Sequence, residues 1–412
     1  MNVSRDRLSV IGKLIGIYRE ERRSNTLNQF TIRGFCEGIC SPNTLKSMEA
    51  GGLSRSEEVY TELLAKLDLK FNSFKVIDDA VHQLVNDLYF EIEYYNEHGI
   101  MLTLNKILRV LSEVKGFIYY SELYELFNNL LLYYDMDINI SDGCVARYIE
   151  LLKVLDFVYL DLLKILLYSK CKTESICDTD KFNDLVNNLC LESSKHEFMK
   201  INLLQIYYIQ TKYLKMYNLI STLEQYFIEK ANYTRLLDVY NCAVILVSNI
   251  DKEKVISYIL KEEKLLANID LPPIKLSEVY SNLGTAYYVM GKYQDALRTY
   301  ERMIKTYDVS FITNYIYMAD CQNRLGIARK IPKIAEEKYL SAPDTLKFMY
   351  KYFLLGEDIP VFVKQNYIMK KVLPNLYDRD LIEIFRFELN NLVKISNHYK
   401  LLHLFDEFIS GE

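Results

Sequence analysis

The chain has 412 residues, 50% of them hydrophobic and 25% charged, with a formal net charge of −5 at pH 7. This composition is typical of a soluble globular protein with more than one domain core. No apolar run reaches the roughly 18 residues that a membrane-spanning helix needs, and the N-terminal sequence MNVSRDRLSV lacks the apolar region of a signal peptide. We therefore expect a cytoplasmic protein that has no membrane partner.

Charge is distributed unevenly along the chain. Residues 1–70 contain 11 Lys and Arg against 9 Asp and Glu, so the remaining 342 residues carry seven more negative than positive charges. This distribution permits phosphate binding by the N-terminal part and argues against nonspecific adhesion of the larger part to nucleic acid.

The first predicted helix and the segment 39–52 (ICSPNTLKSMEAGG) define the N-terminal region. Apolar residues at helical spacing from Ile11 to Tyr18 predict a helix that ends near Arg19. In the segment 39–52, Ser41 can cap a short helix, Pro42 fits its first position, and Gly51 can close its C-terminus.

The same short helix has an apolar side and a polar side. Leu45 and Met48 are three residues apart and can face inward, so that Asn43, Lys46 and Ser47 face outward. A further apolar stripe at helical spacing, from position 59 to position 67, predicts another helix. Four short helices therefore fit into the first 70 residues.

This pattern resembles the XRE-type helix-turn-helix, in particular the version that opens the RRNPP-like, peptide-responsive regulators of Gram-positive bacteria. The resemblance covers residues 11–69. It implies that Arg19 pairs with Glu49 at the end of the recognition helix, and that a homodimer binds a double-stranded DNA operator. The residues expected to form the DNA-binding surface are Arg33, Ser41, Asn43, Thr44, Lys46, Ser47 and Arg55.

Two features differ from the family pattern. The segment between Arg19 and Phe35 is longer than usual, which predicts an enlarged turn from Ser24 to Phe30. Ile32 also stands where the family commonly has a polar residue that contacts DNA. An ordinary corner between two helices remains the alternative interpretation of this region.

The remainder, residues 71–412, is helical in pattern. The whole chain contains only seven prolines and fourteen glycines. Apolar residues recur at spacings of three and four, and polar or glycine-containing breaks predict short connections between antiparallel helices. The stretches with this periodicity are Leu84–Tyr95, Leu123–Tyr133, Leu152–Leu167, Leu203–Tyr217, Leu236–Val247, Val255–Leu266 and Val279–Ile304.

One stretch matches a known repeat. Tyr280, Leu283, Gly284 and Tyr287, followed by Ala296 and Tyr300, have the spacing of a tetratricopeptide (TPR) repeat. In this pattern the small residues lie where the two helices of a pair cross, and the larger ones fill the space beside the crossing. We therefore expect an all-α chain: a helix-turn-helix domain (residues 1–70) followed by a TPR-like α-solenoid (residues 71–412) for ligand binding and dimerisation. An irregular helical domain with one TPR-like pair is the alternative.

No constellation in the sequence indicates catalysis, a cofactor or a metal site. The five histidines are isolated, the eight cysteines contain no CxxC pair, and GxSxG, HExxH, Walker A and GxGxxG motifs are absent. Cys36 and Cys40 are four residues apart, but Cys36 falls on the inward face of its helix. We expect a protein that is not an enzyme and binds neither metal nor cofactor.

The resemblance implies that a short signalling peptide binds in the TPR groove and changes operator binding, as in quorum sensing. In that family, asparagine side chains hold the peptide backbone, since an amide offers both a donor and an acceptor. The candidate peptide-binding residues are Asn241, Ser281, Asn282, Thr285, Tyr288 and Asn314. For each asparagine the alternative is an ordinary surface residue near a helix end, and most tyrosines are interpreted as packing residues.

The competing function is a TPR interaction scaffold, binding a response regulator or a phosphatase target, with a vestigial helix-turn-helix.

Overall fold

The structure is a computed structural model that describes residues 3–23, 29–54, 56–174, 179–248, 250–306, 311–356, 358–376 and 379–410. It is all-α, with 77% helix and no strand in these ranges. None of the helices in the described ranges is both long enough and apolar enough to cross a membrane. The chain divides into two compact units, Met1–Leu236 and Leu237–Glu412, and each is described by itself.

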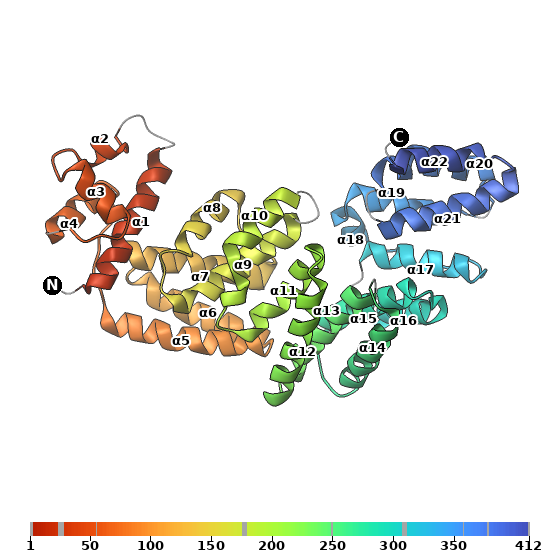
Figure 1. Cartoon of the computed structure of the whole chain (residues 1–412), viewed down its shortest axis with the longest axis horizontal. Coiled ribbons are helices and arrows are strands. Elements are labelled where there is room, and N and C mark those ends of the chain that lie inside the picture. The colour runs from red at the N-terminus through yellow and green to blue at the C-terminus, as the bar shows by residue number, and fades with distance from the viewer. Residues whose placement is uncertain are drawn as a thin grey trace. The chain divides into compact units, whose positions relative to one another are not determined.

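The first unit contains the helices drawn in red to green in Figure 1. Its described helices are α1 (Arg5–Arg23), α2 (Ile32–Cys36), α3 (Pro42–Glu49), α4 (Glu57–Ala65), α5 (Lys75–Glu93), α6 (Glu97–Ser112), α7 (Ile118–Met136), α8 (Asp142–Leu151), α9 (Phe157–Glu174), α10 (Thr179–Leu189), a 3-10 turn η1 (Leu191–Ser193), α11 (Glu197–Ile209) and α12 (Tyr213–Glu229).

Helices α1 to α4 pack around a small apolar core, and we call these four helices the head. Ile11 and Leu14 of α1, Phe35 of α2, Leu45 of α3 and Leu63 of α4 are completely buried. Each helix contributes its apolar face, as the helical periodicity predicts. The head therefore has a core of its own within the first unit.

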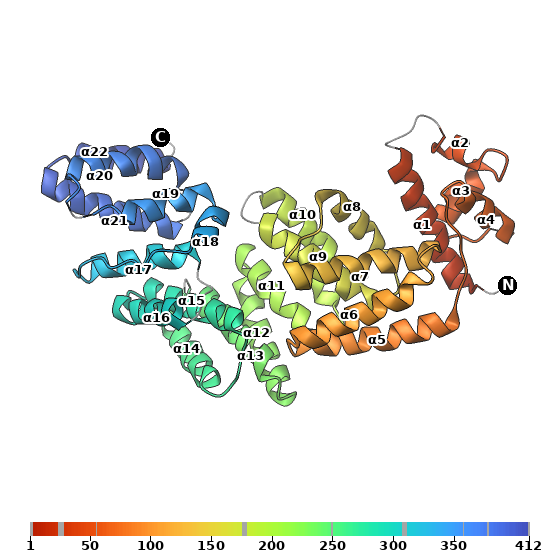
Figure 2. The same cartoon turned by 180° about the vertical axis from the view of Figure 1, so that it is seen from behind.

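Helices α5, α6 and α7 lie side by side as consecutive antiparallel neighbours (Figures 1 and 2). The turn that ends α5 has Tyr95 in the left-handed region (φ 55°), and the N–H of Asn96 donates to the carbonyl of Glu91 at 3.0 Å. The same arrangement recurs at Thr211, between α11 and α12, and at Ala231, after α12. This left-handed cap satisfies the last helical carbonyls and reverses the chain within a few residues.

The second unit is drawn in green to blue in Figure 1, and the division between the units falls inside α13. The described helices from that point on are α13 (Tyr233–Ser248), α14 (Lys252–Leu266), α15 (Pro273–Val289), α16 (Tyr293–Thr306), α17 (Ile312–Arg324), α18 (Glu336–Ser341), α19 (Asp344–Phe353), α20 (Val361–Tyr367), a π turn η2 (Ile368–Val372), a 3-10 turn η3 (Leu373–Asn375), α21 (Arg379–Ser396) and α22 (Lys400–Ser410).

Helices α15 and α16 pack as an antiparallel pair at the repeat-like motif. A Cβ atom added to Gly284 would come within 2.6 Å of the Tyr300 ring, so only glycine allows that ring to lie against α15. Tyr300 and Ala296 are completely buried. The small and large residues of the motif therefore have the packing roles that their spacing predicts.

Two helix boundaries differ from those expected. The stretch Leu152–Leu167 begins in the non-helical turn that separates α8 from α9, and Leu203–Tyr217 covers parts of two helices, because non-helical residues separate α11 from α12. The apolar periodicity continues across these turns, which hides them in the sequence. The two compact units meet at Leu236, and the expected domain boundary near residue 70 stays a prediction.

Candidate functional site

Helix α3 begins with a complete N-terminal cap. The hydroxyl oxygen of Ser41 accepts a hydrogen bond from the backbone N–H of Thr44 at 3.1 Å, and Pro42 occupies the first helical position. The two hydroxyls of Ser41 and Thr44 are also 2.9 Å apart. Both side chains thus stabilise the helix end, while the proline removes an N–H that would have no helical partner.

The C-terminal end of α3 closes with two glycines. Gly51 has a φ of +92°, and the N–H of Gly52 donates to the carbonyl of Ser47 at 2.7 Å. The hydroxyl of Ser9, on α1, donates to the carbonyl of Gly51 at 2.7 Å. This left-handed cap ends the helix, and the bond from Ser9 connects that end to α1.

The two faces of α3 differ sharply. Leu45 and Met48 are completely buried, whereas Asn43, Lys46 and Ser47 are exposed. Within the described residues, the side chains of Asn43 and Lys46 have no hydrogen-bond or ion-pair partner. The outward face therefore presents an amide, which can donate and accept hydrogen bonds, beside a free ammonium group and a hydroxyl.

Helix α2 presents one further candidate residue. Arg33 is exposed, and Ile32 at the start of α2 is half-buried. The ammonium group of Lys66 donates to the backbone carbonyls of Phe35 (2.9 Å) and Glu37 (3.2 Å), so it caps the end of α2. Arg55 and most of the expected enlarged turn, residues 24–28, lie outside the described residues.

Arg19 and Glu49 form a bidentate ion pair between α1 and α3. Nε of Arg19 donates to Oε1 of Glu49 at 2.6 Å, and Nη2 donates to Oε2 at 2.9 Å. Nη1 of Arg19 donates to the carbonyl of Phe30 at 3.0 Å, and Arg19 is only 2% exposed. A planar guanidinium holds a carboxylate in a fixed orientation, so the pair sets the position of the end of α3.

Two glycines on α1, which were not among the residues expected from the sequence, allow this close contact. A Cβ atom on Gly12 would lie 2.5 Å from the carbonyl oxygen of Met48, and one on Gly16 would lie 3.0 Å from Cγ of Glu49. The glycines are four residues apart and therefore lie on one helical face. This i, i+4 spacing was the available signal for a close crossing of α1 with another helix.

Helix α1 also contacts the helices that follow the head. Near its start, Arg7 lies 3.4 Å above the ring of Tyr119 and forms a 3.3 Å ion pair with Asp78. Near its end, Arg147 of α8 donates to both Glu21 of α1 and Glu122 of α7. The same helix that positions α3 is therefore held at both ends by α5, α7 and α8.

The structure brings four of the candidate peptide-binding residues together in the second unit. The amide of Asn282 donates to Oδ1 of Asn241 at 3.0 Å, and the hydroxyl of Ser281 donates to Oδ1 of Asn314 at 2.8 Å. These bonds join α15 to α13 on one side and to α17 on the other. Asn241 and Asn314 are buried, whereas Ser281 and Asn282 are half-buried. We call these four residues the amide cluster.

The other two candidates contact different partners. The hydroxyl of Thr285 donates to the carbonyl of Ser281 at 3.0 Å, and it lies 3.0 Å from the hydroxyl of Tyr300. The hydroxyl of Tyr288 donates to the buried carboxylate of Asp320. Tyr288 is buried, so its ring contributes to packing between α15 and α17 and presents little surface to a ligand.

Charged residues adjoin the amide cluster. Lys275 forms ion pairs with Asp238 (2.7 Å) and Glu278 (3.0 Å), and the amide of Asn241 donates to Glu278 at 3.5 Å. No local sequence pattern distinguishes these three charged residues from other surface charges. They lie on α13 and α15, one or two helical turns from the asparagines, and only the packing of the two helices brings them together.

No family model, no curated protein and no solved structure matches this chain.

Proposed function

We propose that this protein is a DNA-binding transcriptional regulator. In this proposal the head is an XRE-type helix-turn-helix, and α3 is the helix that enters the major groove. The helices after the head form a TPR-like solenoid that binds a short signalling peptide, and a homodimer binds two half-sites of an operator.

The observation that carries the proposal is the outward face of α3. Asn43 and Lys46 are exposed and without described partners on a short helix whose two ends are both capped. An asparagine amide can bond to both N6 and N7 of adenine, and a lysine can neutralise a backbone phosphate. A helix held rigidly at both ends keeps such groups in one orientation, as base reading requires.

Helix α1 supports the regulatory part of the proposal. Its residues Gly12, Gly16 and Arg19 contact α3. Its Arg7 contacts Tyr119 of α7, and its Glu21 accepts a hydrogen bond from Arg147 of α8. A change in α7 or α8 would therefore move α1 and, with it, the end of α3. This gives the solenoid a physical route to the DNA-binding face.

The amide cluster supports the choice of a peptide as the ligand. An extended peptide presents alternating N–H and C=O groups, and Asn282 and Ser281 are half-buried polar residues that carry both donors and acceptors. Their present partners, Asn241 and Asn314, would hold their side chains in place for such a ligand.

The test is a pair of substitutions on α3, measured with promoter DNA from upstream of the gene and with random DNA of equal length. Lys46→Ala should weaken binding to both DNAs and reduce the slope of log K against log salt concentration by about one, because one phosphate contact is lost. Asn43→Ala should cost roughly 1–3 kcal/mol on the promoter site alone, because it removes a base contact.

Lys106 provides a matched control, since it is an exposed lysine on α6 of the same unit. Lys106→Ala should leave both affinities and the salt slope unchanged. If the two α3 variants lost affinity equally on both DNAs, the assigned roles would be wrong. Absence of any DNA binding by the wild-type protein would instead favour the interaction scaffold with a vestigial helix-turn-helix.

A further inference from the structure

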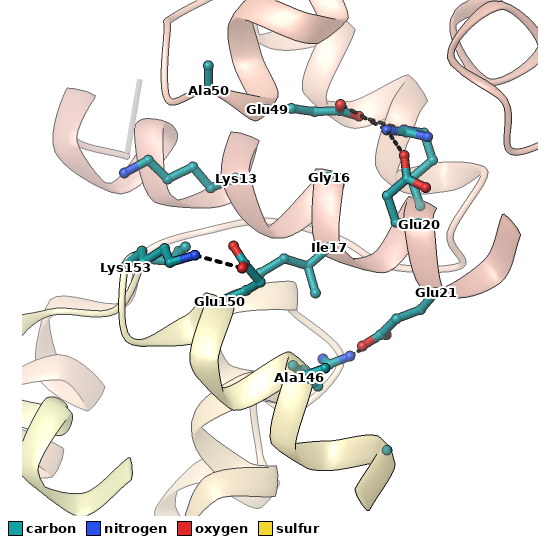
Figure 3. Close-up of a pocket in the computed structure, with 14 residues that line it drawn as sticks. Lys13, Gly16, Ile17, Glu20, Glu21, Glu49, Ala50, Ala146, Glu150 and Lys153 are labelled. Carbon is teal, nitrogen blue, oxygen red and sulfur yellow. Dashed lines mark hydrogen bonds and ion pairs between the residues drawn. The ribbon is translucent and has the colours of Figure 1, made fainter. Parts of the chain in front are cut away.

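A cavity of about 620 Å³ lies between α1, the end of α3 and α8 (Figure 3). Its volume is within the range of roughly 300–1,000 Å³ that is usual for small-molecule sites. The residues that line it come from one face of α1, from the end of α3 and from one face of α8 with the residues just after it. The lining residues are Lys13, Gly16, Ile17, Arg19, Glu20, Glu21, Glu49, Ala50, Gly143, Ala146, Arg147, Glu150, Lys153 and Val154.

The middle of the cavity is open because small residues face it. Gly16 and Ala50 lie on one side, and Gly143 and Ala146 on the other. At Gly16 a Cβ atom would lie 3.0 Å from Cγ of Glu49, a tight contact, but one on Gly143 would meet nothing closer than 3.8 Å. Packing therefore does not explain the small residue at position 143, and the space beside it is large enough for a ligand.

Most charged groups that line the cavity are already paired. Arg19 pairs with Glu49 (2.6 Å) and Glu20 (2.7 Å), and Arg147 pairs with Glu21. Figure 3 shows Glu21 at one end of the cavity, and its bond with Arg147 joins α1 to α8 there. Arg147 also pairs with Glu122, so each of the two guanidinium groups faces two carboxylates, and this end offers no unpaired positive charge to an anion.

The opposite end of the cavity has a positive charge without a described ion-pair partner. Lys13 lies there on α1, and Lys153, which is paired with Glu150 at 2.7 Å, lies across from it (Figure 3). Within the described residues Lys13 has no ion-pair partner. The apolar side chains of Ile17 and Val154 line the wall between the two ends. One unmatched positive charge next to an apolar wall is complementary to a small amphipathic anion.

We propose that this cavity binds a small amphipathic carboxylate. Its carboxylate pairs with Lys13, and its apolar part lies against Ile17, Ala146 and Val154. Such a ligand fills the gap between α1 and α8, which Arg147 of α8 also spans through its contacts with Glu21 and with the ring of Tyr18.

The test is calorimetry on the full chain without DNA, so that its outcome is independent of the proposed DNA-binding function. The probes are hexanoate, octanoate and phenylacetate, with octanamide as an uncharged match for octanoate. We expect saturable binding of at least one acid, and octanoate should bind about three- to tenfold more tightly than octanamide because only the acid pairs with Lys13.

Two variants and one control locate the site. Lys13→Gln should remove the preference for octanoate over octanamide, and Ala146→Phe should abolish binding by filling the cavity. Ala146 is exposed on α8, so the larger side chain does not enter a core, and an unchanged melting temperature checks this. Lys106→Gln should bind all probes as the wild-type protein does. Binding that neither cavity variant changes, or no saturable binding of any acid, would overturn the proposal.

Discussion

Glu262 is a carboxylic acid buried in the second unit. It is completely buried on α14, and neither of its carboxylate oxygens has a hydrogen-bond partner among the described residues. Burial raises the pKa of Glu262 well above its ordinary value, and the nearby charge of Glu263 acts in the same direction. Lys275 opposes the shift, but this lysine is already paired with Asp238 and Glu278. The side chain is therefore held in its neutral form.

Glu262→Gln is expected to change the pH dependence of stability. In the unfolded chain Glu262 ionises near its ordinary pKa, whereas in the folded protein it stays protonated to a higher pH. The wild-type protein therefore loses stability as the pH rises from the ordinary pKa of the unfolded chain through the raised pKa of the folded protein. Each pKa unit between the two corresponds to about 1.4 kcal/mol of unfolding free energy. The variant cannot ionise at this position. Its free energy of unfolding relative to that of the wild type, measured by urea denaturation, should therefore increase from pH 5 to pH 8.

Glu301→Gln, at an exposed position on α16 of the same unit, is the matched control. It should leave the pH dependence of unfolding as it is in the wild type. If the difference in stability between Glu262→Gln and the wild type were constant across this pH range, Glu262 would not be protonated in the folded state.

At the scale of elements, α1 is part of two interfaces at once. One face packs against α3, where a Cβ atom on Gly12 would collide with the backbone of Met48 and one on Gly16 would lie tightly against the side chain of Glu49. Other residues of the same helix reach α7 and α8, among them Glu21, which pairs with Arg147. A helix of 19 residues is long enough to serve both contacts. The head and the helices after it are consequently part of one compact unit.

Arg147→Ala should weaken the attachment of α1 to α7 and α8. Glu122 is 1% exposed, and without Arg147 its carboxylate loses its described ion-pair partner. Removing one partner of a buried pair typically costs about 3–5 kcal/mol, because the remaining charge is left uncompensated. Chemical denaturation should show this loss, and hydrogen exchange should increase at the end of α1.

A second substitution distinguishes the lost charge partner from lost packing. Because Glu122→Gln removes the uncompensated charge, adding it to Arg147→Ala should restore much of the stability. Arg109→Ala, at an exposed site on α6, should change neither measurement. A double variant as unstable as Arg147→Ala alone would assign the loss to the packing of Arg147 on the Tyr18 ring.

At the scale of the whole molecule, the proposed function assigns DNA binding to the first unit and peptide binding to the second. The amide cluster connects three helices of the second unit, α13, α15 and α17, through hydrogen bonds of 3.0 and 2.8 Å. A peptide bound at Asn282 would compete with or extend these bonds. Such a ligand would thereby change how the three helices pack against one another.

Asn282→Ala should separate peptide response from DNA binding. Its only described side-chain bond is to Asn241, so the free variant should fold and bind promoter DNA as the wild type does. Loss of a contact between an amide and a peptide backbone should reduce peptide affinity about ten- to hundredfold. Calorimetry with synthetic peptides encoded by small open reading frames beside the gene measures this directly.

The exposed asparagine Asn218 of α12 offers a control substitution to alanine that should leave peptide affinity unchanged. Equal peptide affinity of Asn282→Ala and the wild type would remove Asn282 from the site. If no such peptide bound the wild-type protein, the second unit would not be a peptide sensor. Light scattering on the same samples tests the proposed homodimer, whose mass would be twice the 48.6 kDa of the chain.

Local features of this protein were predictable from the sequence because they depend on residues close to one another along the chain. The cap at Ser41 and the left-handed turn at Gly51 involve residues within one helical turn of α3. The packing of Gly284 against Tyr300 follows from the spacing of a single helix pair joined by a short turn. In each case the interacting groups are at most sixteen residues apart, either at the end of one helix or within one pair of helices joined by a short turn.

Contacts between distant helices were decided only by the tertiary structure. The partners of Arg147 are 126 and 25 residues away, and nothing in their spacing relates them. Asn241 and Asn314 were expected to face a ligand, yet the packing of α13, α15 and α17 buries both. A helical pattern specifies which face of a helix is apolar but not which other helix covers it, so these contacts arise only when the whole chain has folded.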